Sequence, residues 1–405
     1  MSKEKFLRVI KKLVTPTVIK IVIFLIPVIV LIFYKAMNHT LSFESVFDVK
    51  TFLAIIIAFI CQAIAFSIVN FVERFCEDET KLTVNYGMLI KKYERVNLLE
   101  YKGNKFPVEP LAFRYESEKP FDITVDHVHA SKNYELPKQI AAKSDYMMRA
   151  HRFSVIYNAM NIRLDDLKCE NGKVELLYSR TYYYDSLITN RAMDYRLDNG
   201  KTIRDIYEPG PFLNSLKDSK FSNHLGFNGF IELSNGKIIF IKRDNNLSIG
   251  KSTLGCSIGA SLKSAYALED DRTLSLDKLN HAIIKEIKNE LNIEIDESTK
   301  ITDGIFVFCR DVLEGGRPQF IFYQKLNLTE EDFYSCFKQG VKSNKKDKRA
   351  KKMDGSGCVL LTVDELEKST IHPDKLIANG KQYKMMPLAS ASIVFLLKHL
   401  QNEVS

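Results

Sequence analysis

Two glutamates on one predicted helix, Glu286 and Glu290, are spaced so that they could do chemistry together. Four residues span about one helical turn, so both carboxylates would lie on the same side of the helix. Carboxylate oxygens at that spacing could hold a divalent cation, which would neutralise a bound pyrophosphate. The alternative is a solvent-facing flank on which Lys285 and Lys288 balance the two acids. Spacing alone favours the second interpretation.

The helix that would carry these acids is predicted over residues 275–291. Its buried side is marked by apolar residues that recur every four positions, namely Leu279, Ile283, Ile287 and Leu291. Ser275 can cap the first turn, and Asn292 tolerates the left-handed conformation that often ends a helix. The pattern therefore predicts a helix with one buried stripe and the two glutamates beside it.

Basic and aromatic residues on predicted strands are the second set of candidates for a binding site. Lys242 and Arg243 end one apolar run, and Arg317 precedes another. Their cationic groups could bind phosphate, and the ring of Phe227 could stack on a base. The net charge of +8 also suits an anionic partner, although many membrane proteins share such a charge. We therefore expect Lys242, Arg243, Arg317 and Phe227 to contribute to a ligand pocket.

Two apolar stretches near the N-terminus, residues 18–34 and 52–72, are each about long enough to cross the roughly 30 Å hydrocarbon core of a membrane. Basic residues precede the first stretch, whereas the connection over residues 35–50 is nearly balanced in charge. Positive charges stay on the cytoplasmic side, so both termini should face the cytoplasm. We expect residues 1–75 to form a two-helix transmembrane hairpin in a multi-pass protein of the cell inner membrane.

The rest of the chain is predicted to be a cytoplasmic region of α+β class. A Pro/Gly cluster at residues 208–211 suggests a boundary, with a connecting region of undefined fold over 76–205 before it. That region either extends the following domain or forms part of an oligomer interface. Over 206–405 the pattern predicts a mixed β-sheet packed against helices, including a β-hairpin over 229–243.

The order of elements over about residues 223–397 resembles that of the Nudix family. The family's motif ends in Arg-Glu-apolar-x-Glu-Glu-x-Gly-apolar, and the matching residues here are Lys285-Glu286-Ile287-Lys288-Asn289-Glu290-Leu291-Asn292-Ile293. Lys285 replaces the arginine, Asn289 replaces the first of the paired glutamates, and Asn292 replaces the glycine. An amide is a poorer magnesium ligand than a carboxylate. The resemblance therefore implies a Nudix-like domain with a vestigial motif at Lys285, Glu286, Asn289 and Glu290, and no catalytic residue.

Two apolar spans followed by a divergent Nudix-like domain resemble the transmembrane Nudix effectors of bacterial cyclic-oligonucleotide antiphage signalling. The resemblance implies a receptor rather than an enzyme, without a cofactor, that binds a cyclic oligonucleotide made by a functionally linked synthase. It further implies that the ligand drives assembly of a homo-oligomer, whose helices disrupt the lipid bilayer of the inner membrane and kill the cell.

Two other hypotheses belong to different classes. In the first, the chain is a membrane-anchored Nudix hydrolase that cleaves a nucleoside diphosphate derivative with Mg²⁺ held by Glu286 and Glu290. In the second, the soluble region is a docking module for a protein partner. Metal-dependent product formation would single out the hydrolase.

Overall fold

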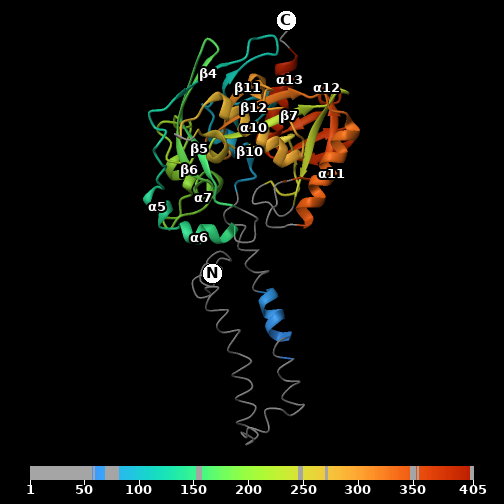
Figure 1. Cartoon of the computed structure of the whole chain (residues 1–405). Coiled ribbons are helices and arrows are strands. Elements are labelled where there is room, and N and C mark those ends of the chain that lie inside the picture. The colour runs from blue at the N-terminus through green and yellow to red at the C-terminus, as the bar shows by residue number, and fades with distance from the viewer. Residues whose placement is uncertain are drawn as a thin grey trace, which may run out of the picture. The chain divides into compact units, whose positions relative to one another are not determined.

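The computed structural model describes residue 57 and residues 60–68, 82–151, 157–244, 250–269, 272–346, 353 and 355–401. Contacts divide the chain into two compact units, Met1–Glu79 and Thr80–Ser405. Most of the described residues belong to the second unit, which is a mixed α/β structure (Figure 1). The expected α+β class with an N-terminal membrane hairpin is therefore replaced by a mixed α/β class for the described residues.

The predicted membrane hairpin, and the multi-pass inner-membrane localisation drawn from it, are wrong for the part of the chain that the structure describes. Within those residues no helix is long and apolar enough to cross a bilayer. The first predicted span, residues 18–34, lies outside the described residues. Of the second, only residue 57 and residues 60–68 are described, and they are helical.

One mixed sheet organises the second unit, with its strands in the order β13-β8-β7-β12-β11-β3. The central pair, β7 and β12, is parallel, and the other neighbours in this order are antiparallel. The short strands β9 and β10 pair with β8 and β7. The bounds are β3 (Val108–Phe113), β7 (Gly226–Glu232), β8 (Lys237–Arg243), β9 (Leu254–Gly255), β10 (Ile258–Ser261), β11 (Ile305–Asp311), β12 (Arg317–Lys325) and β13 (Gly355–Thr362).

Both faces of this sheet are buried. On β12, Phe320 and Phe322 join the core that contains α10 (Leu276–Leu291), whereas Ile321 and Tyr323 join the core that contains α13 (Pro387–Leu400). Burial on both faces explains why β11 and β12 consist of nearly continuous apolar runs rather than alternating ones. The sheet is thus the middle layer of three.

Helix α10 confirms the predicted helix almost to the residue. The Ser275 side chain accepts a hydrogen bond from the Lys278 amide at the N-terminus, and Asn292 ends the helix in the left-handed conformation with φ 57°. Leu279, Ile283 and Ile287 are buried in the core. The predicted hairpin limits also agree with β7 and β8, but these strands pair only at Glu232 and Ile238. They separate because β10 takes the edge of β7 nearer β8.

Residues 80–205 belong to the same compact unit as the main sheet. Strand β3 pairs with β11 in the main sheet. A second sheet has the order β4-β6-β5, with β4 (Asp122–Asp126), β5 (Met160–Glu170) and β6 (Lys173–Tyr182). The Ile162 amide donates to the Leu262 carbonyl, and the Leu225 amide donates to the Ile162 carbonyl. These bonds join β5 to the end of β10 and the start of β7.

Shorter elements surround the two sheets. Those before the main sheet are β1 (Glu100–Tyr101), β2 (Asn104–Lys105), α4 (Tyr86–Lys92), α5 (Lys138–Ala141), α6 (Ser144–Met148), η3 (Arg149–His151), α7 (Tyr183–Ile188), η4 (Asn190–Ala192) and α8 (Ile203–Tyr207). The later ones are α9 (Ser264–Ala267), η5 (Ile301–Gly304), α11 (Glu330–Lys346), α12 (Val363–Glu367), β14 (Thr370–His372), β15 (Lys375–Ala378) and β16 (Lys381–Lys384).

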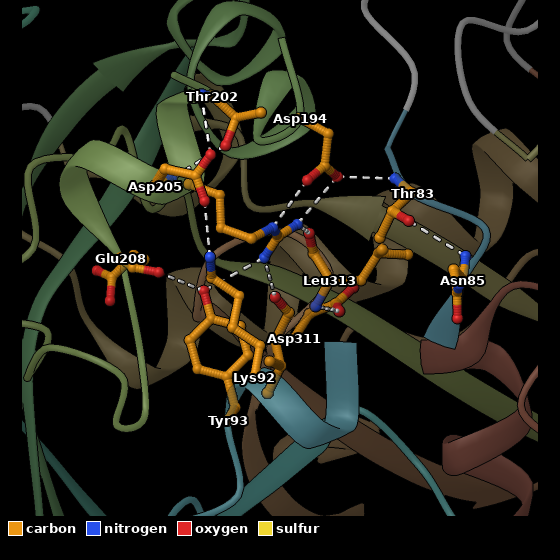
Figure 2. A network of polar contacts seen from close by, with 12 residues as sticks. Thr83, Asn85, Lys92, Tyr93, Asp194, Thr202, Asp205, Glu208, Asp311 and Leu313 are labelled. Carbon is orange, nitrogen blue, oxygen red and sulfur yellow. Dashed lines mark hydrogen bonds and ion pairs between the residues drawn. The ribbon is translucent and has the colours of Figure 1, made fainter. Parts of the chain in front are cut away.

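The loop between β11 and β12 is held by the buried side chain of Arg204, which donates hydrogen bonds to three residues labelled in Figure 2, Asp194, Tyr93 and Leu313. Its guanidinium donates to Asp194 at 2.9 and 3.2 Å and to the carbonyls of Val312 and Leu313 at 3.0 and 2.7 Å. The Thr83 amide also donates to Asp194, at 2.7 Å. One arginine therefore joins α8, the loop and the segment before α4.

We predict that Arg204→Met lowers the free energy of unfolding of the full-length protein by about 3–5 kcal/mol, because it leaves a carboxylate and two carbonyls without their buried donor. Urea denaturation followed by circular dichroism measures this. Arg196→Gln is the matched control, since Arg196 is exposed and donates to the Gly200 carbonyl. Equal losses in both variants would contradict a special role for the buried arginine.

Candidate functional site

The carboxylate of Glu286 on α10 is already paired with a cation from the protein itself. The Lys263 ammonium, between β10 and α9, lies 2.6 Å from Glu286 Oε1, and the Glu286 side chain is only 3% exposed. Burial alone would lower the pKa of Lys263, but the charge and hydrogen bond of Glu286 together raise it above the ordinary value, with smaller contributions from Tyr266 and Glu290. Lys263 is therefore charged at neutral pH.

This ion pair leaves α10 poorly suited to a divalent cation. Lys263 holds one oxygen of the carboxylate that a metal would use, and its own positive charge repels a second cation. Asn289 contributes an amide where the resembling family has a carboxylate. Among the residues that the structure describes, no group of three or more His, Cys, Asp or Glu side chains could hold a metal ion. The residues present do not fit a magnesium site.

The other residues predicted to line a pocket fall in separate places. Lys242 is exposed and Arg243 is partly buried at the end of β8, whereas Arg317 is buried at the start of β12, beyond β7 in the sheet. Phe227 is buried, and its ring stacks on that of Phe320 with centroids 5.0 Å apart. The structure therefore places Phe227 in the core beside α10, where its ring is not available to a base.

Around Arg317 the structure assembles a group of buried and partly buried polar side chains that sequence patterns do not reveal. Arg317 Nη1 lies 2.7 Å from His224 Nε2, and Arg317 Nε lies 2.8 Å from Glu314 Oε2. Arg191 Nε lies 3.7 Å from Glu314 Oε1, and its Nη1 donates to the Tyr183 hydroxyl at 2.6 Å. We call Tyr183, Arg191, His224, Glu314 and Arg317 the basic cluster.

The protonation of His224 follows from this geometry. A guanidinium can only donate, so His224 Nε2 accepts from Arg317 and the imidazole is neutral with its proton on Nδ1. Burial, followed by the charges of Arg317 and Arg191, lowers the pKa of His224 well below its ordinary value. His224 Nδ1 has no hydrogen-bond partner in the described part of the chain. It is a buried N–H donor for which the described residues provide no acceptor.

Two buried amides beside the basic cluster share this property. The side-chain nitrogen and oxygen of Asn161 have no hydrogen-bond partner among the described residues, and the same is true of Gln319 Nε2. Both residues are only 1% exposed. Gln319 lies across Gly226, where a Cβ would stand 2.3 Å from its Oε1. Gly226 is two residues from His224, so the absence of a side chain there makes room for the amide. Buried polar atoms are normally bonded, and so three such groups together indicate a place where something else binds.

Comparisons with known proteins leave this chain without a family. No protein-family model and no curated protein matches it. Among solved structures, it is similar to the crystal structure of DR0079 from Deinococcus radiodurans, with 18% identity and a TM-score of 0.23. That match covers 42% of this chain and 80% of the other. A likeness this weak supports no conclusion about fold or function.

We predict that Mg²⁺ does not change the melting temperature of the wild-type protein, because Lys263 already neutralises Glu286. Lys263→Ala should destabilise the protein by about 1–3 kcal/mol, and Mg²⁺ or Mn²⁺ should restore part of the loss by binding the freed carboxylate. Thermal unfolding with and without the metal measures both effects.

The matched control is Lys278→Ala, because Lys278 lies on the same helix as Glu286 but pairs at 3.5 Å with Glu269, a partly exposed residue before that helix. It should lose little stability and gain no response to metal. A wild-type protein that is stabilised by Mg²⁺ as strongly as Lys263→Ala would show that the lysine does not exclude the metal.

Proposed function

We propose that the unit Thr80–Ser405 is a receptor that binds a nucleotide without cleaving it, and that its ligand is a cyclic oligonucleotide. The observation that carries the proposal is the 2.6 Å ion pair between Lys263 and Glu286. It lies on the helix whose sequence resembles the Nudix motif, where a hydrolase needs a metal. On the same resemblance, we propose that the receptor is the sensing part of an antiviral defence effector and is linked to a cyclic nucleotide synthase.

The chemistry of the ion pair supports binding over hydrolysis. A magnesium ion in a hydrolase binds carboxylates, phosphate oxygens and water at once, and so lowers the pKa of that water. An ammonium carries one charge, offers only donors and cannot coordinate water in that way. Lys263 can therefore hold α10 in place and attract an anion, but cannot generate the nucleophile.

The charge of the protein agrees with an anionic ligand. Its net charge is +8, and two arginines that lie outside α10, the partly buried Arg191 and the buried Arg317, add positive charge to the interior of the unit. If the ligand binds one assembly state more tightly than another, it shifts the population toward that state, which is how a receptor of this kind would signal. Homo-oligomer assembly is therefore part of the proposal.

We predict that a cyclic oligonucleotide raises the melting temperature of the full-length protein, equally with Mg²⁺ and with EDTA. At about one hundred times the dissociation constant, the ligand should stabilise the fold by about 2.7 kcal/mol. A panel of cyclic di- and trinucleotides, beside linear nucleotides, identifies the ligand, and chromatography of the ligand after incubation shows whether it is intact. Sedimentation with saturating ligand tests for assembly.

Two results would count against the proposal. One is a stabilisation seen only with Mg²⁺ and a linear nucleoside diphosphate derivative, which is then consumed. If Glu290→Gln abolished that consumption, the hydrolase hypothesis would replace the receptor. The other is the absence of any shift with every cyclic nucleotide in the panel.

A further inference from the structure

The basic cluster lies outside α10 and is built from parts of the chain far apart in sequence. Tyr183 and Arg191 come from α7 and η4, His224 precedes β7, and Glu314 and Arg317 border the β11–β12 loop. The rings of Tyr183 and His224 lie 6.2 Å apart, and the Arg191 guanidinium lies 5.3 Å from the Tyr183 ring centroid. The cluster is thus a compact group rather than a scatter of buried charges.

Strand register places the unsatisfied amides on both sides of His224. Arg163 on β5 forms a bridge with His224, and Asn161 points to the same side of β5 as Arg163. The Tyr183 amide donates to the Ala159 carbonyl, so α7 begins beside Asn161. On the other side, Gln319 follows Arg317 by two residues on β12 and pairs in register with Gly226.

Positive charge dominates this group. Arg191 and Arg317 face the carboxylate of Glu314, and the exposed Lys251 adds a further cation close enough to act on His151. Burial, then Arg191, then Lys251 lower the pKa of His151 to about 4, so that this imidazole is also neutral at neutral pH. His151 Nε2 has no partner in the described part of the chain.

A nearby acid adds little negative charge to offset these cations. Asp311 is buried, and burial followed by the charge of Glu314 raises its pKa well above the ordinary value of a carboxyl group. The neutral form of Asp311 is therefore favoured. The buried donors of this region that have no acceptor among the described residues suit an anion with several acceptor oxygens.

We propose that the basic cluster, with His151, Asn161, Lys251 and Gln319, is a phosphate-binding site. Guanidinium groups and N–H donors suit the tetrahedral oxygens of a phosphate, and the Arg191 side chain is 13% exposed, so solvent can reach it. A phosphate would give acceptors to His224 Nδ1, His151 Nε2 and the two amides. The identification of that phosphate as part of a nucleotide rests on the proposed function, whereas the site itself does not.

The test uses isothermal titration calorimetry of the full-length protein with inorganic phosphate, pyrophosphate and the panel of cyclic nucleotides. Sodium chloride at matched ionic strength is the reference, because exposed cations bind any anion weakly. The variants are Arg191→Gln, Lys251→Gln and Asn161→Asp. Lys168→Gln is the matched control, since Lys168 is an exposed cation at the far end of β5 that pairs with Glu175.

Arg191→Gln should weaken phosphate binding about 10- to 100-fold, the usual effect of losing a charge-assisted hydrogen bond. Lys251→Gln should weaken it only a few-fold and reduce its salt dependence, because Lys251 is exposed. Asn161→Asp should abolish it, since a carboxylate of the same size would repel the anion. Lys168→Gln should bind as wild type. Circular dichroism melts confirm that each variant is folded.

The outcomes separate the two proposals. If the variants lose phosphate and cyclic nucleotide together, both proposals hold. If cyclic nucleotide binds all variants as it binds wild type, the receptor remains and the site is wrong. If phosphate binding follows the variants but no cyclic nucleotide binds, the site remains for free phosphate and the receptor fails. If wild type binds neither above the chloride reference, the unsatisfied donors bind only water and the site is overturned.

Discussion

The contact of Arg204 with the β11–β12 loop is the constraint on which the rest of the polar architecture depends. Two carbonyls of that loop accept hydrogen bonds from its guanidinium, which in turn is held by Asp194. The loop connects β11 to β12, so fixing it also fixes the position of Glu314 within the loop and of Arg317 at the first residue of β12. Removing one partner from a buried ionic network leaves the other polar groups without hydrogen bonds. These contacts therefore favour a single conformation of the loop over its alternatives.

The unit has two sites with buried or partly buried cations, one at α10 and one in the basic cluster, and their charges are balanced differently. At α10 a lysine is matched to one carboxylate, and the pair is complete within the protein. In the basic cluster, Arg191 and Arg317 share Glu314, and several buried donors nearby have no acceptor in the described part of the chain. The first arrangement accounts for stability without a metal. The second arrangement contains buried donors that the described residues leave without acceptors, and we therefore place the proposed phosphate site there.

Local patterns predicted the elements well, but not the site. The limits of α10 follow from apolar periodicity and two capping residues, all within one short segment. The partner of Glu286 lies 23 residues away, and no spacing rule connects it to Lys263. Arg317 was a candidate from sequence, but its neighbours Arg191 and His224 come together only when β5 docks beside β7. Phe227 shows the converse limit, because an aromatic on a strand gives no sign of which face it occupies.

The apolar stretches near the N-terminus illustrate how composition can suggest more than the described residues show. Hydropathy alone supported two spans, but the first stretch and much of the second lie outside the described residues. Within the described residues, no helix is long and apolar enough to cross a membrane. The receptor proposal therefore rests on the second unit alone.

The hydrogen bonds of Asp194 determine where a fragment that contains only the second unit can begin. Its Oδ2 accepts from both the Thr83 amide and Arg204 Nη2, so a residue near the start of the unit shares an acceptor with the arginine beneath the β11–β12 loop. A fragment that begins at Thr80 retains this amide, whereas one trimmed to the first residue of α4, Tyr86, removes it. The shortest fragment that keeps the network intact is thus set by a hydrogen bond, and not by the first helix.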